Sequence, residues 1–228
     1  MARRKSQLSL ARTSGWGGAR PGAGRKPAGP RAGVTHDSRP PHVHRHPLHV
    51  TLRAVGGLGS LRDNPAFLAL WDAIAAASFA AFRVIHFSIQ HDHLHLIVEA
   101  DDRKVLSRGM QGLSIRAARA LNRALERRGR VWADRYHARA LTTPREARAA
   151  IVYVLQNWRK TVRGAEGLDG CSTARWFDGW KGPRPRSTLP EPDEPSPVCA
   201  ARSWLLTQGW RRGGGPIRFA ERPRDALD

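Results

Sequence analysis

Acidic residues and long apolar runs are scarce in this sequence of 228 residues. It has 19 Asp and Glu against 39 Lys and Arg, so the formal net charge is +20, which favours a polyanionic partner such as nucleic acid. No stretch approaches the roughly 18 to 20 consecutive apolar residues of a membrane span, and no apolar signal region follows the Arg-rich start. We therefore expect a soluble, unexported protein of the cytoplasm without a membrane partner.

Cysteine is also rare. The two cysteines, Cys171 and Cys199, stand far apart and form no C-x-x-C pair, which argues against a cysteine zinc site or a redox motif. We expect both to be free thiols in a reducing compartment.

The positive charge is concentrated in two segments. Residues 1–45 hold 10 basic and 1 acidic residue, and residues 103–163 hold 16 and 3. The first segment lacks apolar periodicity, so we expect a disordered basic arm in which Arg25 and Lys26 contact DNA, although a solubilising tail has the same composition. Residues 46–163 are expected to form the folded domain, and residues 164–228 a Pro- and Gly-rich linker with a C-terminal appendage that docks or stays loose.

Within 46–163 the apolar pattern alternates between the periods of strands and helices. Strands are predicted at 48–55, 82–89, 94–98 and 136–141, and helices at 64–75, at 105–125 and from Pro144 onward. Thr143, Pro144 and Glu146 form a capping box at the start of the last helix. The order of elements predicts an α+β fold, an antiparallel sheet with helices packed on one face.

The sharpest local motif is His93-Leu94-His95, which lies inside a predicted strand. Residues two apart on a strand point to the same face, so the two imidazoles project side by side. Two imidazoles on one face make half of a metal site, and a divalent ion there could polarise a phosphoryl oxygen of DNA. Histidines that only hydrogen-bond to their neighbours are the competing interpretation.

A second candidate feature lies on the last helix, where Tyr153 and Asn157 are spaced i and i+4 and share one face. The phenol could attack a phosphate, and the amide oxygen could complete the coordination of the ion. A core aromatic is the alternative role for Tyr153. Tyr136 is the other tyrosine of the chain, but it falls on a predicted strand without such a partner.

Together the His93-Leu94-His95 strand, the basic helix after it and Tyr153-Val154-Leu155-Gln156-Asn157 resemble the single-tyrosine HUH transposases, in particular the REP-associated tyrosine transposases related to the 200-like insertion sequences. The resemblance covers roughly 46–163 and implies a ferredoxin-like sheet. It also implies that His93, His95 and Asn157 bind Mg²⁺ or Mn²⁺, and that Tyr153 is the nucleophile. The implied reaction cuts single-stranded or hairpin DNA, leaves a 5′-phosphotyrosine and a free 3′-hydroxyl, and can be reversed by strand transfer.

The chain departs from its relatives at Gln90-His91-Asp92 before the histidines and at Asn157-Trp158-Arg159 after the tyrosine. Neither change removes a proposed ligand or the nucleophile. The DNA sequence preference and the choice between homodimer and monomer stay open.

Several further residues are predicted to contact DNA. Arg116, Arg119, Arg123 and Arg127 form a stripe on the predicted helix 105–125, and like charges at this spacing repel unless an anion lies alongside. Arg135 and His137 lie in the segment before the tyrosine helix. The cluster of His42, His44, His46 and His49 is expected to be solvated or to face nucleic acid rather than to bind a metal.

Two other classes of protein compete with a transposase. One is a DNA-binding protein that derives from a transposase and has lost catalysis. The other is a metal-dependent nuclease or RNA-binding protein in which water attacks and Tyr153 is structural.

Overall fold

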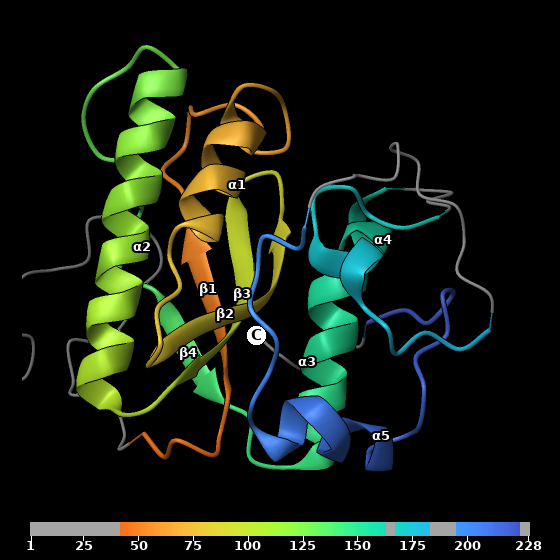
Figure 1. Cartoon of the computed structure of the whole chain (residues 1–228). Helices are drawn as coiled ribbons and strands as arrows, with labels where there is room; N and C mark the ends of the chain where they lie inside the picture. The colour runs from red at the N-terminus through yellow and green to blue at the C-terminus, as the bar shows by residue number, and fades with distance from the viewer. Residues whose placement is uncertain (1–41, 163–166, 183–194, 224–228) are drawn as a thin grey trace, which may run out of the picture. The chain divides into compact units, whose positions relative to one another are not determined.

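The computed structural model describes residues 42–162, 167–182 and 195–223, and the predicted DNA contacts Arg25 and Lys26 lie outside these ranges. Its sheet has the order β2-β3-β1-β4 with every pair antiparallel (Figure 1). The strands are β1 (Leu48–Arg53), β2 (Phe82–Ile89), β3 (His93–Ala100) and β4 (His137–Ala140). Since β3 separates β1 from β2, these two run parallel without pairing, as in ferredoxin-like folds. The predicted α+β class is confirmed.

One face of the sheet is covered by α1 (Ala66–Ala75) and α2 (Arg103–Ala124). Asp102 caps α2 by accepting a hydrogen bond from the Val105 N–H at 2.8 Å. The predicted apolar stripe of α2 is buried against alternate side chains of β1, β2 and β3. The buried stripe consists of Leu106, Met110, Leu113, Ala117 and Leu121.

The other face is covered by α3 (Pro144–Gln156), so the prediction that all helices pack on one face is wrong. The capping box predicted from Thr143 and Glu146 is present at its start. Strands β2 and β3 are each buried at all but one position, and α3 buries every residue from Ala150 to Gln156. A sheet that is buried on both faces needs a cover on each side, because otherwise its second face would remain in water.

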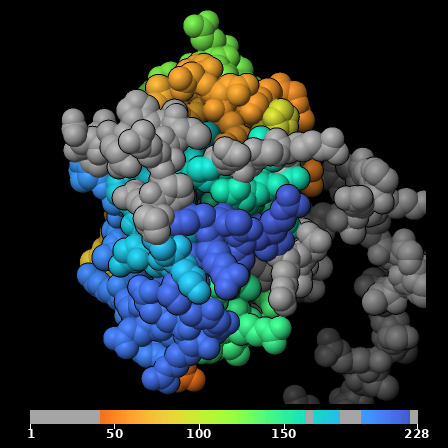
Figure 2. Space-filling model, turned by 90° about the vertical axis from the view of Figure 1, so that its right-hand side faces the viewer, coloured from red at the N-terminus to blue at the C-terminus, as the bar shows by residue number. Residues whose placement is uncertain are grey.

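The described C-terminal residues form the outer cover of α3. They include η1 (Thr173–Trp176), η2 (Leu205–Gly209) and α5 (Trp210–Arg212), while the short α4 (Trp158–Thr161) follows α3 directly. Leu206, Trp210 and Ile217 join the core of α3, and the Gln156 side chain donates to the Arg218 carbonyl at 2.9 Å. Viewed from this side, the blue and cyan atoms of these segments occupy much of the surface (Figure 2).

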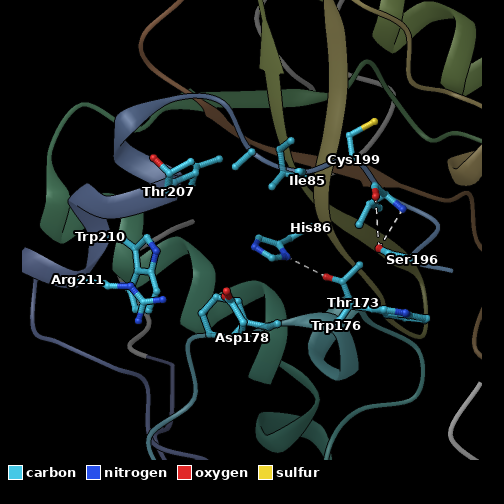
Figure 3. A pocket seen from close by; sticks show the side chains of 15 residues that line it. Ile85, His86, Thr173, Trp176, Asp178, Ser196, Cys199, Thr207, Trp210 and Arg211 are labelled. Atoms are coloured by element: carbon cyan, nitrogen blue, oxygen red, sulfur yellow. Dashed lines mark hydrogen bonds between the residues drawn. The ribbon is translucent and has the colours of Figure 1, made fainter.

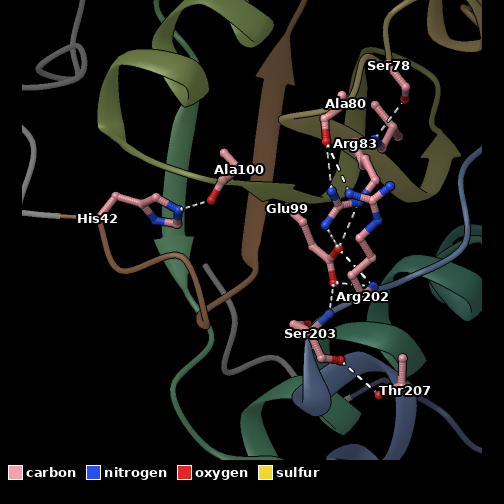
Figure 4. A network of polar contacts seen from close by, with 10 residues as sticks. His42, Ser78, Ala80, Arg83, Glu99, Ala100, Arg202, Ser203 and Thr207 are labelled. Atoms are coloured by element: carbon pink, nitrogen blue, oxygen red, sulfur yellow. Dashed lines mark hydrogen bonds and ion pairs between the residues drawn. The ribbon is translucent and has the colours of Figure 1, made fainter.

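A buried carboxylate joins these C-terminal residues to the sheet (Figure 4). Glu99 on β3 is 2% exposed; it accepts hydrogen bonds from Arg83 Nη2 at 2.5 Å and from the Ser203 N–H at 2.8 Å. The Arg202 N–H donates to it at 3.0 Å. Burial opposes ionisation of Glu99, but these donors outweigh burial and hold its pKa below the ordinary value.

Gly109 marks the closest approach of α2 to the sheet. A Cβ there would lie 2.3 Å from the Phe82 ring, whereas a Cβ at Gly112 on the same helix would meet nothing within 4 Å. We expect Gly109→Ala to lower the free energy of unfolding by about 1–2 kcal/mol, because overpacking costs more than the gain in helix propensity. Gly112→Ala should raise it by about 0.5–1 kcal/mol. Urea unfolding measures both, and a stabilising Gly109→Ala would contradict the packing described.

Glu99→Gln should destabilise the protein by about 3 kcal/mol at pH 7, since it removes one partner of a buried ion pair. Folding lowers the pKa of Glu99, so its contribution is present above its ordinary pKa, near 4.5, and is lost as the pH falls through its folded-state value. The difference between wild type and variant should therefore shrink in acid. Unfolding curves at several pH values test this, with the exposed Asp101→Asn as control; a difference that does not change with pH would count against the network.

Candidate active site

His93 and His95 lie on the face of β3 that α3 covers. Their Nε2 atoms are 2.9 Å apart, and His95 is 1% exposed. Burial, together with the nearby His49, His93 and Lys160, lowers the pKa of His95 to about 2. The His95 imidazole is therefore neutral at pH 7 and has a lone pair to offer.

Neighbouring groups hold the Nδ1 atom of each of these two rings. His93 Nδ1 lies 2.7 Å from Asp92 Oδ1, and His95 Nδ1 lies 3.2 Å from both Thr51 Oγ1 and His49 Nε2. When each Nδ1–H donates to these acceptors, both Nε2 atoms carry lone pairs and face one another. Such an arrangement is suited to a shared cation.

Asp92 is ionised beside His93. Burial opposes its ionisation, but hydrogen bonds from His93 and Arg53 outweigh burial and hold its pKa below the ordinary value. Arg53 Nη2 lies 2.9 Å from Asp92 Oδ2. The carboxylate is thus available as an acceptor for His93 Nδ1–H across the neutral pH range.

Helix α3 carries Tyr153 to these histidines. The Tyr153 ring is 4% exposed and meets His95 edge-on, with ring centroids 4.9 Å apart and planes at 83°. Its centroid is 5.5 Å from that of His49, and Lys160 Nζ lies over the Tyr153 ring, 4.7 Å from the same centroid. The structure therefore brings together three residues that the sequence separates widely: His49, His95 and Tyr153.

Asn157 follows the last residue of α3 and keeps helical backbone angles, φ −59° and ψ −35°. It is 6% exposed and lies one turn beyond Tyr153, as the i, i+4 spacing predicts. Its backbone carbonyl accepts from the Lys160 N–H at 2.9 Å, which begins the short turn of α4.

The donor set fits a divalent ion with octahedral coordination. Two nitrogens about 2.1 Å from such an ion and 90° apart lie about 3.0 Å from one another, close to the observed 2.9 Å between His93 Nε2 and His95 Nε2. In the described part of the chain no three His, Cys, Asp or Glu side chains gather in a way that could hold a metal. An Asn amide oxygen is a further type of donor that such an ion accepts.

Tyr136, the rival phenol, lies away from the histidines. It is 9% exposed and belongs to the core on the α1 and α2 face of the sheet, whereas Tyr153 belongs to the core on the α3 face. His137 is exposed and pairs with Thr51, which in turn pairs with His95. His137 thus stands in the same cross-strand row as His95, two strands away.

The predicted arginine stripe has three members rather than four. Arg116, Arg119 and Arg123 are exposed on α2, on the side of the sheet opposite to Tyr153. Arg127 lies beyond the end of α2, after Glu126 with φ 49°, and its guanidinium donates to Asn122 Oδ1 at 2.8 Å and to the Arg130 carbonyl. The predicted stripe is wrong at this position because the helix ends before it. Arg135 is exposed, and its N–H donates to Asp134.

Three groups of the site were not predicted from the sequence: His49, Asp92 and Lys160. His49 was grouped with the other early histidines as a solvated or nucleic-acid-facing residue, yet it is 3% exposed on β1. The signal was present in the strand period, since His49 and Thr51 alternate with the apolar Leu48, Val50 and Leu52. His42 is separate from this site and lies 2.7 Å from the Ala100 carbonyl oxygen.

None of the described helices has the length and apolar character needed to cross a membrane. No curated protein matches the chain. A solved structure of a REP-associated tyrosine transposase bound to a REP hairpin is similar to it, with 14% sequence identity, a TM-score of 0.53 and coverage of 71% of this chain and 100% of that one. At this identity the likeness supports the fold.

The family model of IS200-like transposases matches residues 73–157, a segment that contains His93, His95, Tyr153 and Asn157. The match confirms the resemblance of this chain to the IS200-like transposases, and the solved structure confirms the fold that the resemblance implies.

Proposed function

We propose that this protein is a metal-dependent tyrosine transposase that cuts and rejoins single-stranded DNA through a covalent link to Tyr153. The observation that supports this most directly is the contact between the Tyr153 ring and His95, whose Nε2 faces His93 Nε2 at 2.9 Å. The proposed nucleophile on α3 and the proposed pair of ligands on β3 thus lie side by side, with Tyr153 and His95 buried and His93 partly exposed to solvent.

In this proposal His93, His95 and Asn157 would hold Mg²⁺ or Mn²⁺. When bound, the ion would polarise a non-bridging oxygen of the scissile phosphate and offset charge that develops on it. Asp92, Thr51 and His49 keep the two ligand rings in the tautomer that offers Nε2.

Tyr153 supplies the nucleophile. Its phenol oxygen loses a proton and forms a bond to the phosphorus, while the bond from phosphorus to the 3′ oxygen of the neighbouring nucleotide breaks. The 3′ oxygen takes up a proton and leaves as a hydroxyl, and the strand stays attached as a 5′-phosphotyrosine. The Lys160 ammonium lies over the Tyr153 ring, 4.7 Å from its centroid, in a cation–π contact. A 3′-hydroxyl reverses the step and rejoins DNA.

The basic surface of α2 supports a DNA partner. Helix α2 carries six basic residues and no acidic one over 22 residues, so an adjacent polyanion relieves the repulsion among them. These residues lie on the opposite side of the sheet from Tyr153, and we assign them to the phosphate backbone of a hairpin stem. The six are Arg103, Lys104, Arg108, Arg116, Arg119 and Arg123.

Incubation with labelled hairpin DNA from the repeats that flank the gene, in Mn²⁺, followed by denaturing electrophoresis, tests the proposal. Wild type should give a protein–DNA adduct, Tyr153→Phe none, and His95→Ala at least about 100-fold less. Tyr136→Phe, which removes the rival hydroxyl from the other core, is the matched control and should retain the adduct.

The remaining outcomes discriminate among the alternatives. DNA binding by wild type with no adduct on any flanking repeat would favour a non-catalytic DNA-binding protein. Cleavage that survives Tyr153→Phe would favour a nuclease in which water attacks.

A further inference from the structure

A pocket separate from the pair of His93 and His95 lies on the α3 side of the sheet, beside β2. It is a cavity of about 500 Å³, within the range of ligand pockets. Its walls come from β2, from the segment around η1 and from residues 196–211 (Figure 3). The polar or aromatic side chains that matter for its chemistry are those of His86, Thr173, Trp176, Asp178, Trp210 and Arg211.

The pocket adjoins the catalytic residues along the sheet. His86 pairs with Ile97, and Ser88 pairs with His95, so His86 is the diagonal same-face neighbour of His95. Diagonal neighbours of this kind are about 7–8 Å apart. A DNA strand held at His95 therefore has a neighbouring nucleotide within reach of the pocket.

The polar groups of the pocket offer both donors and acceptors. His86 Nδ1 lies 3.1 Å from Thr173 Oγ1, and no described residue hydrogen-bonds its Nε2. Asp178 is exposed and makes no ion pair with any described residue. The Arg211 guanidinium lies over the Trp210 ring, 4.4 Å from its centroid.

Burial lowers the pKa of His86 to about 4, partly offset by Asp178. The imidazole is thus neutral at pH 7, with one donor and one acceptor nitrogen. A carboxylate, a guanidinium and a neutral imidazole around aromatic walls are complementary to the edge of a nucleobase, which itself mixes donors and acceptors.

The charges of the pocket suit a base better than a phosphate. The outer face of α2 carries only basic charges and suits phosphate, whereas Asp178 and Arg211 offset one another in the pocket, and Asp178 would repel a phosphate there. Partly exposed rings such as Trp176 and His86 suit the flat face of an uncharged base.

We propose that this pocket takes one unpaired nucleobase of the DNA strand that passes His95, and that it contributes to the choice of the sequence that is cut. This inference rests on the proposed function and adds a recognition site to it. Asp178 and Arg211 read the edge of the base, and the β2 floor with His86 limits its depth.

The test is an abasic scan. In the single-stranded flank of the hairpin each nucleotide in turn is replaced by an abasic site, and binding is measured for wild type, Asp178→Asn and Ala200→Trp, which fills the pocket from an exposed position on its wall. Asp101→Asn makes the same charge change at an exposed residue outside the pocket. Thermal unfolding confirms that each variant folds.

At one flank position the abasic site should weaken wild-type binding about tenfold. With intact DNA, Asp178→Asn and Ala200→Trp should each bind about tenfold more weakly than wild type. An abasic site at that position should weaken the binding of these two variants by less than about a further twofold. Asp101→Asn should behave as wild type.

If the abasic site weakens DNA binding equally in wild type and in both pocket variants at every position, the inference is overturned. If wild type still forms the tyrosine adduct in that case, the proposed function stands and only the pocket assignment fails. If wild type forms no adduct and does not bind the hairpin, both the proposed function and the pocket assignment are overturned.

Discussion

Strand β3 sends alternate side chains into two different cores, and the positions of His93, His95 and Glu99 follow from this alternation. Leu94, Leu96 and Val98 pack beneath α1 and α2, while His93, His95 and Glu99 face α3 and the C-terminal residues. The two histidines stand at one end of this second face, and the Glu99 carboxylate stands at the other. A shift of one residue in the register of β3 would therefore exchange the histidines for leucines and remove the site.

The Glu99 network and the C-terminal residues hold α3 against this face. Glu99 binds the Ser203 N–H, Gln156 donates to the Arg218 carbonyl, and Arg148 donates to Glu221 Oε2 at 2.8 Å. A Cβ at Gly213 would lie 2.4 Å from the Pro144 carbonyl oxygen, so the chain passes the start of α3 closely. These contacts hold the helix that carries Tyr153 against the sheet.

The sequence was most informative where the period of apolar residues was clear. The four strands, α2 and the capping box of α3 were predicted within a few residues, and the His93-Leu94-His95 alternation placed both imidazoles on one face. The position of α3 was missed, because its second half, from Ala150 to Gln156, is buried on all sides and has no polar stripe to show which face it covers. Arg127 was misplaced because apolar spacing extends to Leu125, whereas the helix ends at Ala124.

The C-terminal contacts could not be predicted, because they join residues far apart in the chain. Glu99 and Ser203 are 104 positions apart, and neither lies in a motif that indicates the other. The same holds for His49, 46 positions before His95. Its burial depends on the pairing of β1 with β3, which the local pattern leaves open.

Binding of Mn²⁺ tests the central claim most directly, namely that His93 and His95 form a divalent metal site beside Tyr153. Electron paramagnetic resonance of the full chain with Mn²⁺ should show one bound ion with nitrogen coupling from two imidazoles. His95→Ala should weaken binding at least about tenfold, while His44→Ala, at an exposed histidine, should leave it unchanged. Equal Mn²⁺ affinity in wild type and His95→Ala, or a bound ion without imidazole coupling, would contradict the account.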